Sequence, residues 1–202
     1  MKAIGVIANC SKPQARDVLA RVQLKAAELG LRLYTDDAAA ARLLPGARLV
    51  APPRLAARVD ALLALGGDGT MLHAARLVQA TGTPILGVNL GNLGFLTSST
   101  SDELERGLDA VAAGTFRLSE RSAAEGTAWR GRRRLGTFRA LNDIVVGWGQ
   151  SSRIITLDVA VNGEHIASYR CDGLIVSTPT GTTGHSLSAG GPIIHPDARA
   201  FL

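Results

Sequence analysis

The sequence predicts an α/β amino-terminal domain, in which a parallel sheet carries helices on both faces, followed by an all-β, β-sandwich-like domain. Two observations predict this order. Short apolar runs alternate with helical periodicity through the first half of the chain, and from Phe116 onward β-rich runs follow one another through short turns. The expected boundary divides the 202 residues into residues 1–114 and residues 115–202.

Apolar periodicity predicts the elements of the first domain one by one. The run "AIGVIAN" at residues 3–9 is typical of a buried strand. Residues 15–30 predict a helix that ends at Gly30, because apolar positions recur on one face: Val18, Leu19, Val22, Ala26 and Leu29. Further strands are expected over residues 31–35, 61–65 and from Pro84, with helices over residues 36–47, together with a loop, and 71–81.

A last helix of this domain is expected after Ser101. Ser101 is predicted to cap it, Asp102 and Glu103 occupy its first turn, and Gly114 stands where it should end. The second domain then shows β-rich runs at residues 140–148, 154–163, 164–171 and 173–179, and Asn162-Gly163 is a typical hairpin turn.

Composition indicates an ordinary globular protein and excludes a disordered one, with 46% hydrophobic and 19% charged residues. The net charge of +5 suits a polyanion, which includes nucleotides as well as nucleic acid. Aromatic residues make up only 4%, which argues against a base-stacking surface.

Cysteine use and hydropathy predict a cytoplasmic, soluble protein. Cys10 and Cys171 match no metal-binding spacing, which favours a reducing compartment. The amino terminus does not resemble a signal peptide, and no apolar run approaches the roughly 20 residues of a membrane helix.

The stretch "LGGDGTMLHAARL" at residues 65–77 predicts a phosphate cradle made by Gly66, Gly67, Gly69 and Thr70. Glycines let the backbone turn sharply and present N–H groups at the mouth of a helix. It is not a P-loop, because no Gly-Lys-Ser/Thr follows. Asp68 has two interpretations, which are a helix cap before Met71 and an acid with a catalytic or Mg²⁺-linked role.

Two other stretches stand out after predicted strands. Residues 87–97, "GVNLGNLGFLT", form a glycine-bearing turn that lets backbone come close to something, without matching the dinucleotide fingerprint. Residues 172–196 crowd small hydroxyl side chains and glycines, which favours close approach of a polar ligand, although plain loops share this composition.

The chain resembles the bacterial NAD kinases. The resemblance is carried by "GGDGT" at residues 66–70, "LND" at residues 141–143 and "DGLIVSTPTGTTGHSLSAGGPIIHP" at residues 172–196, in this order. The first motif is shared with a wider superfamily that includes diacylglycerol, sphingosine and phosphofructokinases, whereas the third is far more specific. The resemblance covers essentially the whole chain.

The resemblance implies transfer of a phosphoryl group from ATP, or polyphosphate in some members, to the 2′-hydroxyl of the adenosine ribose of NAD. It also implies a divalent metal ion such as Mg²⁺, for which no direct protein ligand is assigned, and a homodimer or homotetramer. By position, Asp68 becomes the proton acceptor and Gly69 lies against the nucleotide.

The same resemblance implies NAD contacts in the second domain. Asn142 and Asp143 match the pair that binds adenine and ribose hydroxyls, although from the residues alone they indicate a turn before a strand. Arg153, Arg170 and Asp172 fall on other NAD-contacting positions and otherwise are ordinary polar residues at strand ends.

Residues 183–188 match the segment that wraps the adenosine end of NAD: Thr183, Gly184, His185, Ser186, Leu187 and Ser188. Here the chain has Gly184 and His185 where the common family pattern has Ala-Tyr, so we expect a smaller ring against adenine and a group that titrates near neutral pH. His73 falls where some members place a basic residue near the nucleotide; a histidine on a helix surface is the alternative.

The family pattern continues with more strands beyond the position of Leu202, so we expect a carboxy-terminally incomplete β domain with an open sheet edge. Either the chain is a fragment, or another chain supplies the rest. The alternatives to a kinase acting on NAD are a lipid or sugar kinase of the same superfamily and a catalytically weak NAD(P)-binding remnant. The basic run "WRGRRR" at residues 129–134 predicts an exposed hairpin turn rather than a nucleic-acid site.

Overall fold

The computed structural model describes residues 1–91, 94–147 and 154–202 of the chain. These residues form two compact units, Met1–Ser119 and Glu120–Leu202, which are described separately below. The segment at residues 115–123, where the first unit gives way to the second, has no helix or strand.

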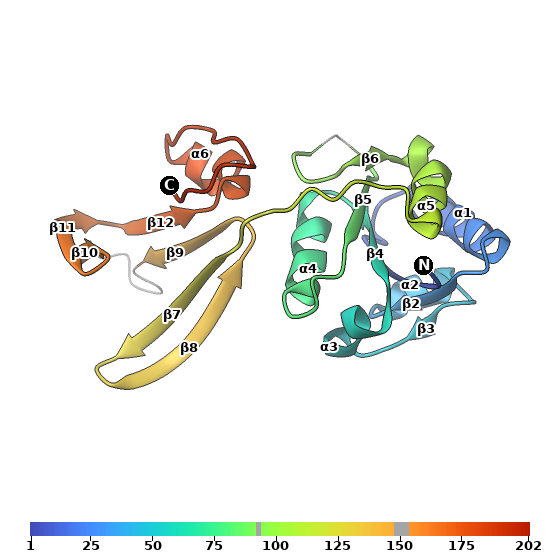
Figure 1. Ribbon diagram of the computed structural model, residues 1–202, viewed down its shortest axis with the longest axis horizontal. Coiled ribbons are helices and arrows are strands. Elements are labelled where there is room, and N and C mark those ends of the chain that lie inside the picture. Colours follow the sequence, from blue (N-terminus) through green and yellow to red (C-terminus); the bar gives the residue numbers. More distant parts are fainter. Residues whose placement is uncertain (92–93, 148–153) are drawn as a thin grey trace. The chain divides into compact units, whose positions relative to one another are not determined.

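A parallel sheet forms the centre of the first unit (Figure 1). Among the described residues it has six strands in the order β3-β2-β1-β4-β5-β6, and every neighbouring pair is parallel. The strands are β1 Ala3–Ala8, β2 Arg32–Thr35, β3 Arg48–Leu49, β4 Ala61–Gly66, β5 Ile85–Asn89 and β6 Ser99–Thr100. The predicted parallel sheet is therefore confirmed.

Helices cover both faces of this sheet, because successive side chains of a strand point to opposite sides. Ile4 and Val6 pack with α1 and α5, whereas Ala3 and Ile7 pack with α3 and α4. The helical elements are α1 Ala15–Glu28, α2 Ala38–Leu43, α3 Pro52–Leu55, α4 Asp68–Val78 and α5 Leu104–Ala113, with 3₁₀ turns η1 Ala56–Arg58 and η2 Ser101–Glu103.

Two helix starts differ from the sequence-based expectation. Helix α4 begins at Asp68 rather than near Met71, because the glycine turn is complete at the N-cap Gly67. The helical segment before α5 is capped by Thr100 rather than Ser101, and the Glu103 carboxylate accepts the Thr100 N–H at 3.1 Å. The predicted end at Gly114 is confirmed, where φ is 72°.

The second unit is β-rich, as predicted, and its described strands pair in twos. Antiparallel pairs join β7 Ala124–Arg130 with β8 Arg133–Ala140, β9 Asp143–Gly147 with β12 Gly173–Ser177, and β10 Ile155–Val161 with β11 Glu164–Cys171. The 3₁₀ turn η3 Thr180–Thr183 and the short helix α6 His185–Ser188 follow β12.

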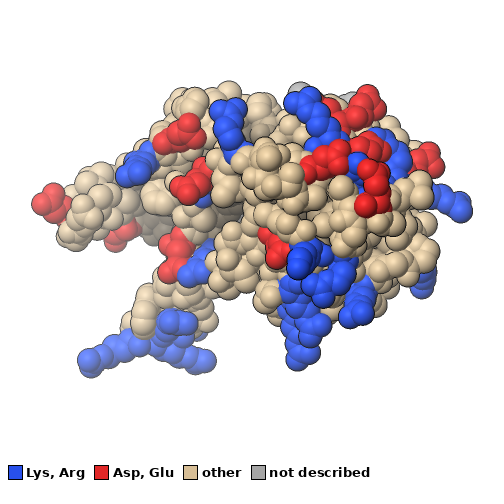
Figure 2. Space-filling view, turned by 45° about the vertical axis from the view of Figure 1, so that its right-hand side comes forward, with Lys and Arg blue, Asp and Glu red and all other residues tan. Residues whose placement is uncertain are grey.

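Both predicted hairpin turns of this unit are confirmed. Asn162 and Gly163 join β10 to β11 with φ values of 53° and 86°, as an Asn-Gly hairpin turn requires. The "WRGRRR" run spans the β7–β8 turn, where Gly131 has a φ of 58°. Figure 2 shows basic side chains gathered at the end of this hairpin, and the side chains of residues 129–134 are exposed.

Across the described ranges, no helix is both long enough and apolar enough to cross a bilayer.

Candidate functional site

The strand order marks the carboxyl ends of the central strands as the expected position of a binding site. The chain winds from β1 outward to β2 and β3, and then returns to β4 on the other side of β1. In doubly wound sheets ligands bind outside the carboxyl ends of the strands at this switch point. The carboxyl ends of β1 and β4 therefore mark the expected site.

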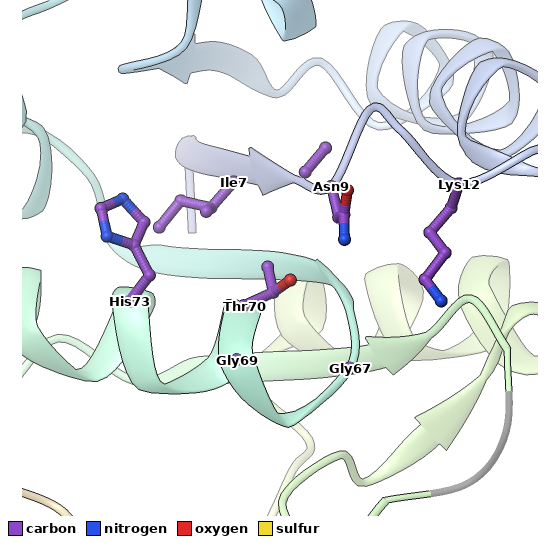
Figure 3. Close-up of a pocket in the computed structure, with 8 residues that line it drawn as sticks. Ile7, Asn9, Lys12, Gly67, Gly69, Thr70 and His73 are labelled. Atoms are coloured by element: carbon purple, nitrogen blue, oxygen red, sulfur yellow. The ribbon is translucent and has the colours of Figure 1, made fainter.

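An open pocket of about 370 Å³ lies at this point (Figure 3). Its lining comes from the end of β1, the segment after it, and the start of α4: Ile7, Ala8, Asn9, Lys12, Gly67, Gly69, Thr70 and His73. Figure 3 shows Asn9 and Lys12 on the segment after β1, and Thr70 and His73 on α4. Three of the four residues of the predicted phosphate cradle thus line the pocket.

Asp68 lies at the start of α4, directly between the pocket-lining glycines. Its carboxylate accepts two backbone hydrogen bonds, from Phe95 N–H to Oδ2 at 3.1 Å and from Leu96 N–H to Oδ1 at 3.0 Å. The N-cap is Gly67, and within the described residues the carboxylate makes no cap bond to its own helix. The helix-cap interpretation of Asp68 is therefore wrong.

The three glycines of the turn serve different needs. A Cβ on Gly66 would lie 2.1 Å from Thr70 Oγ1, so Gly66 is required by close packing. A Cβ on Gly67 or Gly69 would meet nothing within 4 Å among the described residues, and both glycines border the pocket. The first N–H groups of a helix have no partner within that helix, and next to open space they favour an anion.

Lys12 is a pocket residue that the sequence analysis did not select. Its side chain is exposed, and in the described part of the chain no carboxylate lies within ion-pair distance of its Nζ. The sequence held a signal for it, because Lys12 lies in the segment between the first strand and the first helix of an α/β pattern.

His73 also lines the pocket, from the second turn of α4. Its Nε2 lies 3.3 Å from Asp36 Oδ2 at the end of β2, and its side chain is 49% exposed. His73 is thus a histidine on a helix surface, as the alternative interpretation held. It also lines the pocket, which is compatible with the predicted position near a nucleotide.

In the second unit, the 141–143 motif lies against the hydroxyl-rich segment. Thr178 Oγ1 donates to the Leu141 carbonyl at 2.5 Å, and Thr178 N–H donates to the Asn142 carbonyl at 2.8 Å. A Cβ on Gly181 would lie 2.1 Å from the Asn142 carbonyl oxygen, so only glycine allows this approach. The structure therefore brings together two motifs that are more than thirty residues apart in the chain.

Two buried polar atoms lie within this cluster. Asn142 Oδ1 and Thr180 Oγ1 have no hydrogen-bond partner among the described residues. Buried polar atoms are nearly always paired, so an unpaired one in a native site calls for an explanation such as a bound ligand. Asn142 does precede a strand, as the turn interpretation held, and Asp143 is the first residue of β9. Thr180 was not among the predicted site residues, although the composition of its segment singled it out.

The predicted adenosine-binding segment spans the end of η3 and the whole of α6. Thr183 ends η3, Gly184 connects the two with φ −105° and ψ −122°, and His185 begins α6. Ser186 is buried, whereas His185, Leu187 and Ser188 are exposed.

The other predicted NAD contacts are not joined to this cluster. Arg170 is exposed on β11 opposite Thr156, and Asp172 is exposed between β11 and β12. Neither has a hydrogen bond or an ion pair to the 141–143 motif within the described ranges. Arg153 lies outside the described residues.

Neither cysteine forms a disulfide, and the pKa of the Cys10 thiol is raised by burial and by the neighbouring Asp37 carboxylate. Cys10 is therefore a poor nucleophile. Among the described residues no group of three or more His, Cys, Asp or Glu side chains is placed to hold a metal ion.

A doubly wound unit with a glycine-lined pocket at its switch point is typical of the class of nucleotide-binding α/β proteins. Comparison with known proteins narrows this class. The chain matches the ATP-NAD kinase N-terminal domain over residues 4–116 and the ATP-NAD kinase C-terminal domain over residues 141–202. The chain therefore belongs to the ATP-NAD kinase family.

Relatives agree with this assignment. The chain is 44% identical over 202 residues to the NAD kinase of Moorella thermoacetica and 40% identical over 206 residues to that of Syntrophotalea carbinolica. It is matched over its whole length and spans 64% and 71% of these two proteins.

Solved structures share the fold. Yeast NADH kinase complexed with NADH superposes with a TM-score of 0.89 at 24% identity, over 100% of this chain and 64% of that one. An NAD kinase from Archaeoglobus fulgidus in complex with ATP gives 0.74 at 26% identity, over 100% of this chain and 70% of that one.

Proposed function

We propose that the protein catalyses the NAD kinase reaction, in which the γ-phosphoryl group of ATP moves to the 2′-hydroxyl of the adenosine ribose of NAD. The observation that carries the proposal is the Asp68 carboxylate, which two backbone N–H groups hold between two glycines that border an open pocket. Membership of the ATP-NAD kinase family supplies the chemistry.

In this reaction the 2′-oxygen attacks the γ-phosphorus, the bond from that phosphorus to the β–γ bridging oxygen breaks, and ADP leaves. Asp68 accepts the proton of the hydroxyl. Phosphoryl transfer passes through a loose transition state, so positioning and charge neutralisation contribute more than strong base catalysis. A carboxylate held in a fixed orientation suits this requirement better than a free side chain.

The pocket supports the binding of an anionic phosphoryl donor, ATP or polyphosphate. Gly67, Gly69 and Thr70 lie at the start of α4, where N–H groups and the helix dipole favour phosphate, and Lys12 brings a positive charge. Mg²⁺ usually keeps one or two carboxylates together with substrate phosphates as ligands, and the described residues offer no protein cage. We therefore assign a metal ion to the phosphates, with Asp68 as the neighbouring carboxylate. The metal ion would offset the charge of the phosphates there.

NAD is assigned to the second unit. The unpaired Oδ1 of Asn142 and the neighbouring Asp143 support recognition of adenine and ribose hydroxyls. The exposed His185 offers a ring for adenine, and residues 183–188 supply small polar groups beside it. Arg153, Arg170 and Asp172 remain predicted contacts, as do a homodimeric or homotetrameric assembly and a cytoplasmic location.

The test is NADP⁺ formation from NAD⁺, ATP and Mg²⁺, followed with an NADP-specific dehydrogenase, for the wild type and Asp68→Asn. Because the amide keeps the size of the carboxylate but cannot take the proton, we expect the rate to fall by roughly 10²- to 10⁴-fold. NAD binding by calorimetry and the thermal midpoint are measured on the same samples as controls for folding.

If Asp68→Asn retains the wild-type rate, Asp68 is not the proton acceptor. A folded wild type that binds NAD without turning it over would instead indicate the binding-only alternative. A lipid or sugar alcohol phosphorylated in place of NAD would favour the wider superfamily.

A further inference from the structure

The stretch at residues 87–97 is the glycine-bearing one for which the sequence offered no partner. The structure shows that the backbone of its residues 95 and 96 approaches Asp68. Phe95 and Leu96 turn their N–H groups toward Asp68, and each bonds a different carboxylate oxygen. Two donors on two oxygens restrict both side-chain torsions of Asp68, which a single hydrogen bond would not do. The turn thus determines where the carboxylate points.

The ends of this turn are fixed to the sheet. Leu90 N–H donates to the Gly66 carbonyl at 3.0 Å, and Leu90 is 2% exposed. Ser98 N–H donates to the Gly87 carbonyl at 3.1 Å and closes the base of the turn. The donors at positions 95 and 96 therefore have a defined position relative to β4, whose end leads into Asp68.

Gly94 is what allows the turn to come this close. A Cβ at position 94 would lie 2.2 Å from Asp68 Oδ1, 2.7 Å from Asp68 Cγ and 3.0 Å from Oδ2. The first two distances are too short for a carbon atom and the third is tighter than most such contacts, and all three atoms belong to the end of one side chain. The carboxylate would rotate away, while the backbone around it has no need to move.

We infer that residues 94–96 act as a clamp that positions the Asp68 carboxylate for phosphoryl transfer, with Gly94 as a positioning residue. The inference rests on the proposed function for its catalytic consequence, whereas the clamp itself is a feature of the fold. Glycine is required at position 94 because it leaves room for the Asp68 carboxylate on α4, and not because of the conformation of its own loop.

The kinetic test uses Gly94→Ala in the full chain. We expect kcat to fall by roughly 10- to 100-fold, because a reacting group displaced by about an ångström loses rate on this scale. The KM values for NAD and ATP should stay within about twofold of the wild type, since the clamp contacts a group that acts in the transition state.

Gly91→Ala is the matched control in the same turn. A Cβ there would lie 3.7 Å from Lys12 Nζ and 4.0 Å from Asn89 Oδ1, which are ordinary contacts, so kcat should stay within about twofold. In an Asp68→Asn background, Gly94→Ala should cause little further loss, because both changes act through one side chain. Full activity of Gly94→Ala, or an equal loss in Gly91→Ala, would overturn the inference.

A second measurement does not depend on turnover. The amide proton signals of Phe95 and Leu96 report their hydrogen bonds in NMR spectra, and Asp68→Ala defines the shift expected when the carboxylate is removed. Gly94→Ala should move both signals in the same direction as Asp68→Ala. Unchanged signals would refute the clamp even if the protein is a kinase, and moved signals would support it even if the wild type proves inactive on NAD.

Discussion

At the scale of single residues, the glycine turn shows how one residue type serves opposite purposes. Gly66 is enclosed, since a Cβ would lie 2.1 Å from Thr70 Oγ1 and 2.8 Å from Thr70 Cβ. Gly69 is open, because apart from its chain neighbours and its own helix backbone no described atom lies within 4 Å of the position of a Cβ, and it borders the pocket. The first is therefore required by packing, and the second leaves space for a ligand.

This contrast predicts different outcomes for two alanine substitutions. Gly66→Ala should lower the free energy of unfolding by about 1–3 kcal/mol, as overpacking does. Gly69→Ala should leave it unchanged or raise it by up to about 1 kcal/mol, because alanine is the better helix former inside α4. The added methyl group should nevertheless weaken ATP binding.

Urea unfolding and ATP titration calorimetry on both variants measure the two effects separately. Equal losses of stability would contradict the packing argument. Unchanged ATP affinity in Gly69→Ala would argue against this part of the pocket as the donor site.

At the scale of elements, ion pairs link α1 to α5 across the first unit. Arg21 Nε donates to Glu105 Oε1 at 2.7 Å and Arg21 Nη2 to Glu105 Oε2 at 2.5 Å. Lys25 Nζ lies 2.7 Å from Asp109 Oδ1, one turn further along both helices. The Arg21 guanidinium holds the pKa of the Glu105 carboxyl below its ordinary value of 4.5.

We expect Glu105→Gln to lower the free energy of unfolding by about 0.5–1 kcal/mol at neutral pH, since the pair is partly exposed. The folded pKa lies below the unfolded one, so the ionised carboxylate stabilises the folded state fully at pH values above its ordinary pKa of 4.5. This contribution disappears as the pH falls through the folded pKa. The difference between wild type and variant should therefore shrink in acid.

Urea unfolding across a pH series measures this dependence. Glu28→Gln is the matched control, because Glu28 is 66% exposed and pairs with Lys25 inside a single helix. A difference that grows in acid would reverse the assigned sign. If Glu28→Gln lowers the free energy of unfolding as much as Glu105→Gln does, the ion pair between the helices contributes no more than a pair within one helix.

At the scale of the whole molecule, the two units differ in how much they bury. Among the described residues, the buried Ala, Val, Leu, Ile and Tyr side chains lie in Met1–Ser119, with the exception of Ala124. In the second unit Phe138 is 59% exposed and Val145 47%. Burial of apolar surface is the main source of folding free energy, so stability is concentrated in the first unit.

Amide hydrogen exchange on the full chain should reveal this inequality. We expect the amides of β1 and β4 to exchange only through global unfolding of their unit, whereas those of β7 and β8 exchange through more frequent local opening. Mass spectrometry of proteolytic peptides after labelling measures both sets in one experiment. Equal protection in the two units would contradict the inference from burial.

The sequence determined the elements of the fold where a local pattern has one reading. The buried run at residues 3–9, the one-sided apolar face of α1 and the Asn162-Gly163 turn each depend on neighbours a few positions away, and the structure confirms them. Helix α4 starts earlier than predicted because the glycine turn is already complete at Gly67. The segment before α5 starts at a different cap because Thr100 and Ser101 are neighbouring candidates and local pattern does not decide between them.

The motifs also determined which segments deserve attention. Gly66, Gly67, Gly69 and Thr70 were selected from spacing alone, and Asn142, Asp143 and residues 183–188 from resemblance. What spacing does not report is which oxygen of a side chain meets which donor from a distant segment. Lys12 and Thr180 lie in segments for which the sequence held a signal, but only their surroundings in the fold, a pocket and an unpaired buried hydroxyl, identify them as site residues.

Tertiary structure alone decided the character of Asp68. From spacing alone the sequence favoured a helix cap over an acid in a cradle. The fold brings residues 94–96 against Asp68 from across the end of the sheet. The Phe95 and Leu96 N–H groups donate to its carboxylate, which makes no cap bond to its own helix. The sequence by itself therefore determined the family, the elements and the location of the glycine cradle. The direction of one carboxylate required the contact between segments nearly thirty residues apart, because hydrogen-bond geometry exists only in three dimensions.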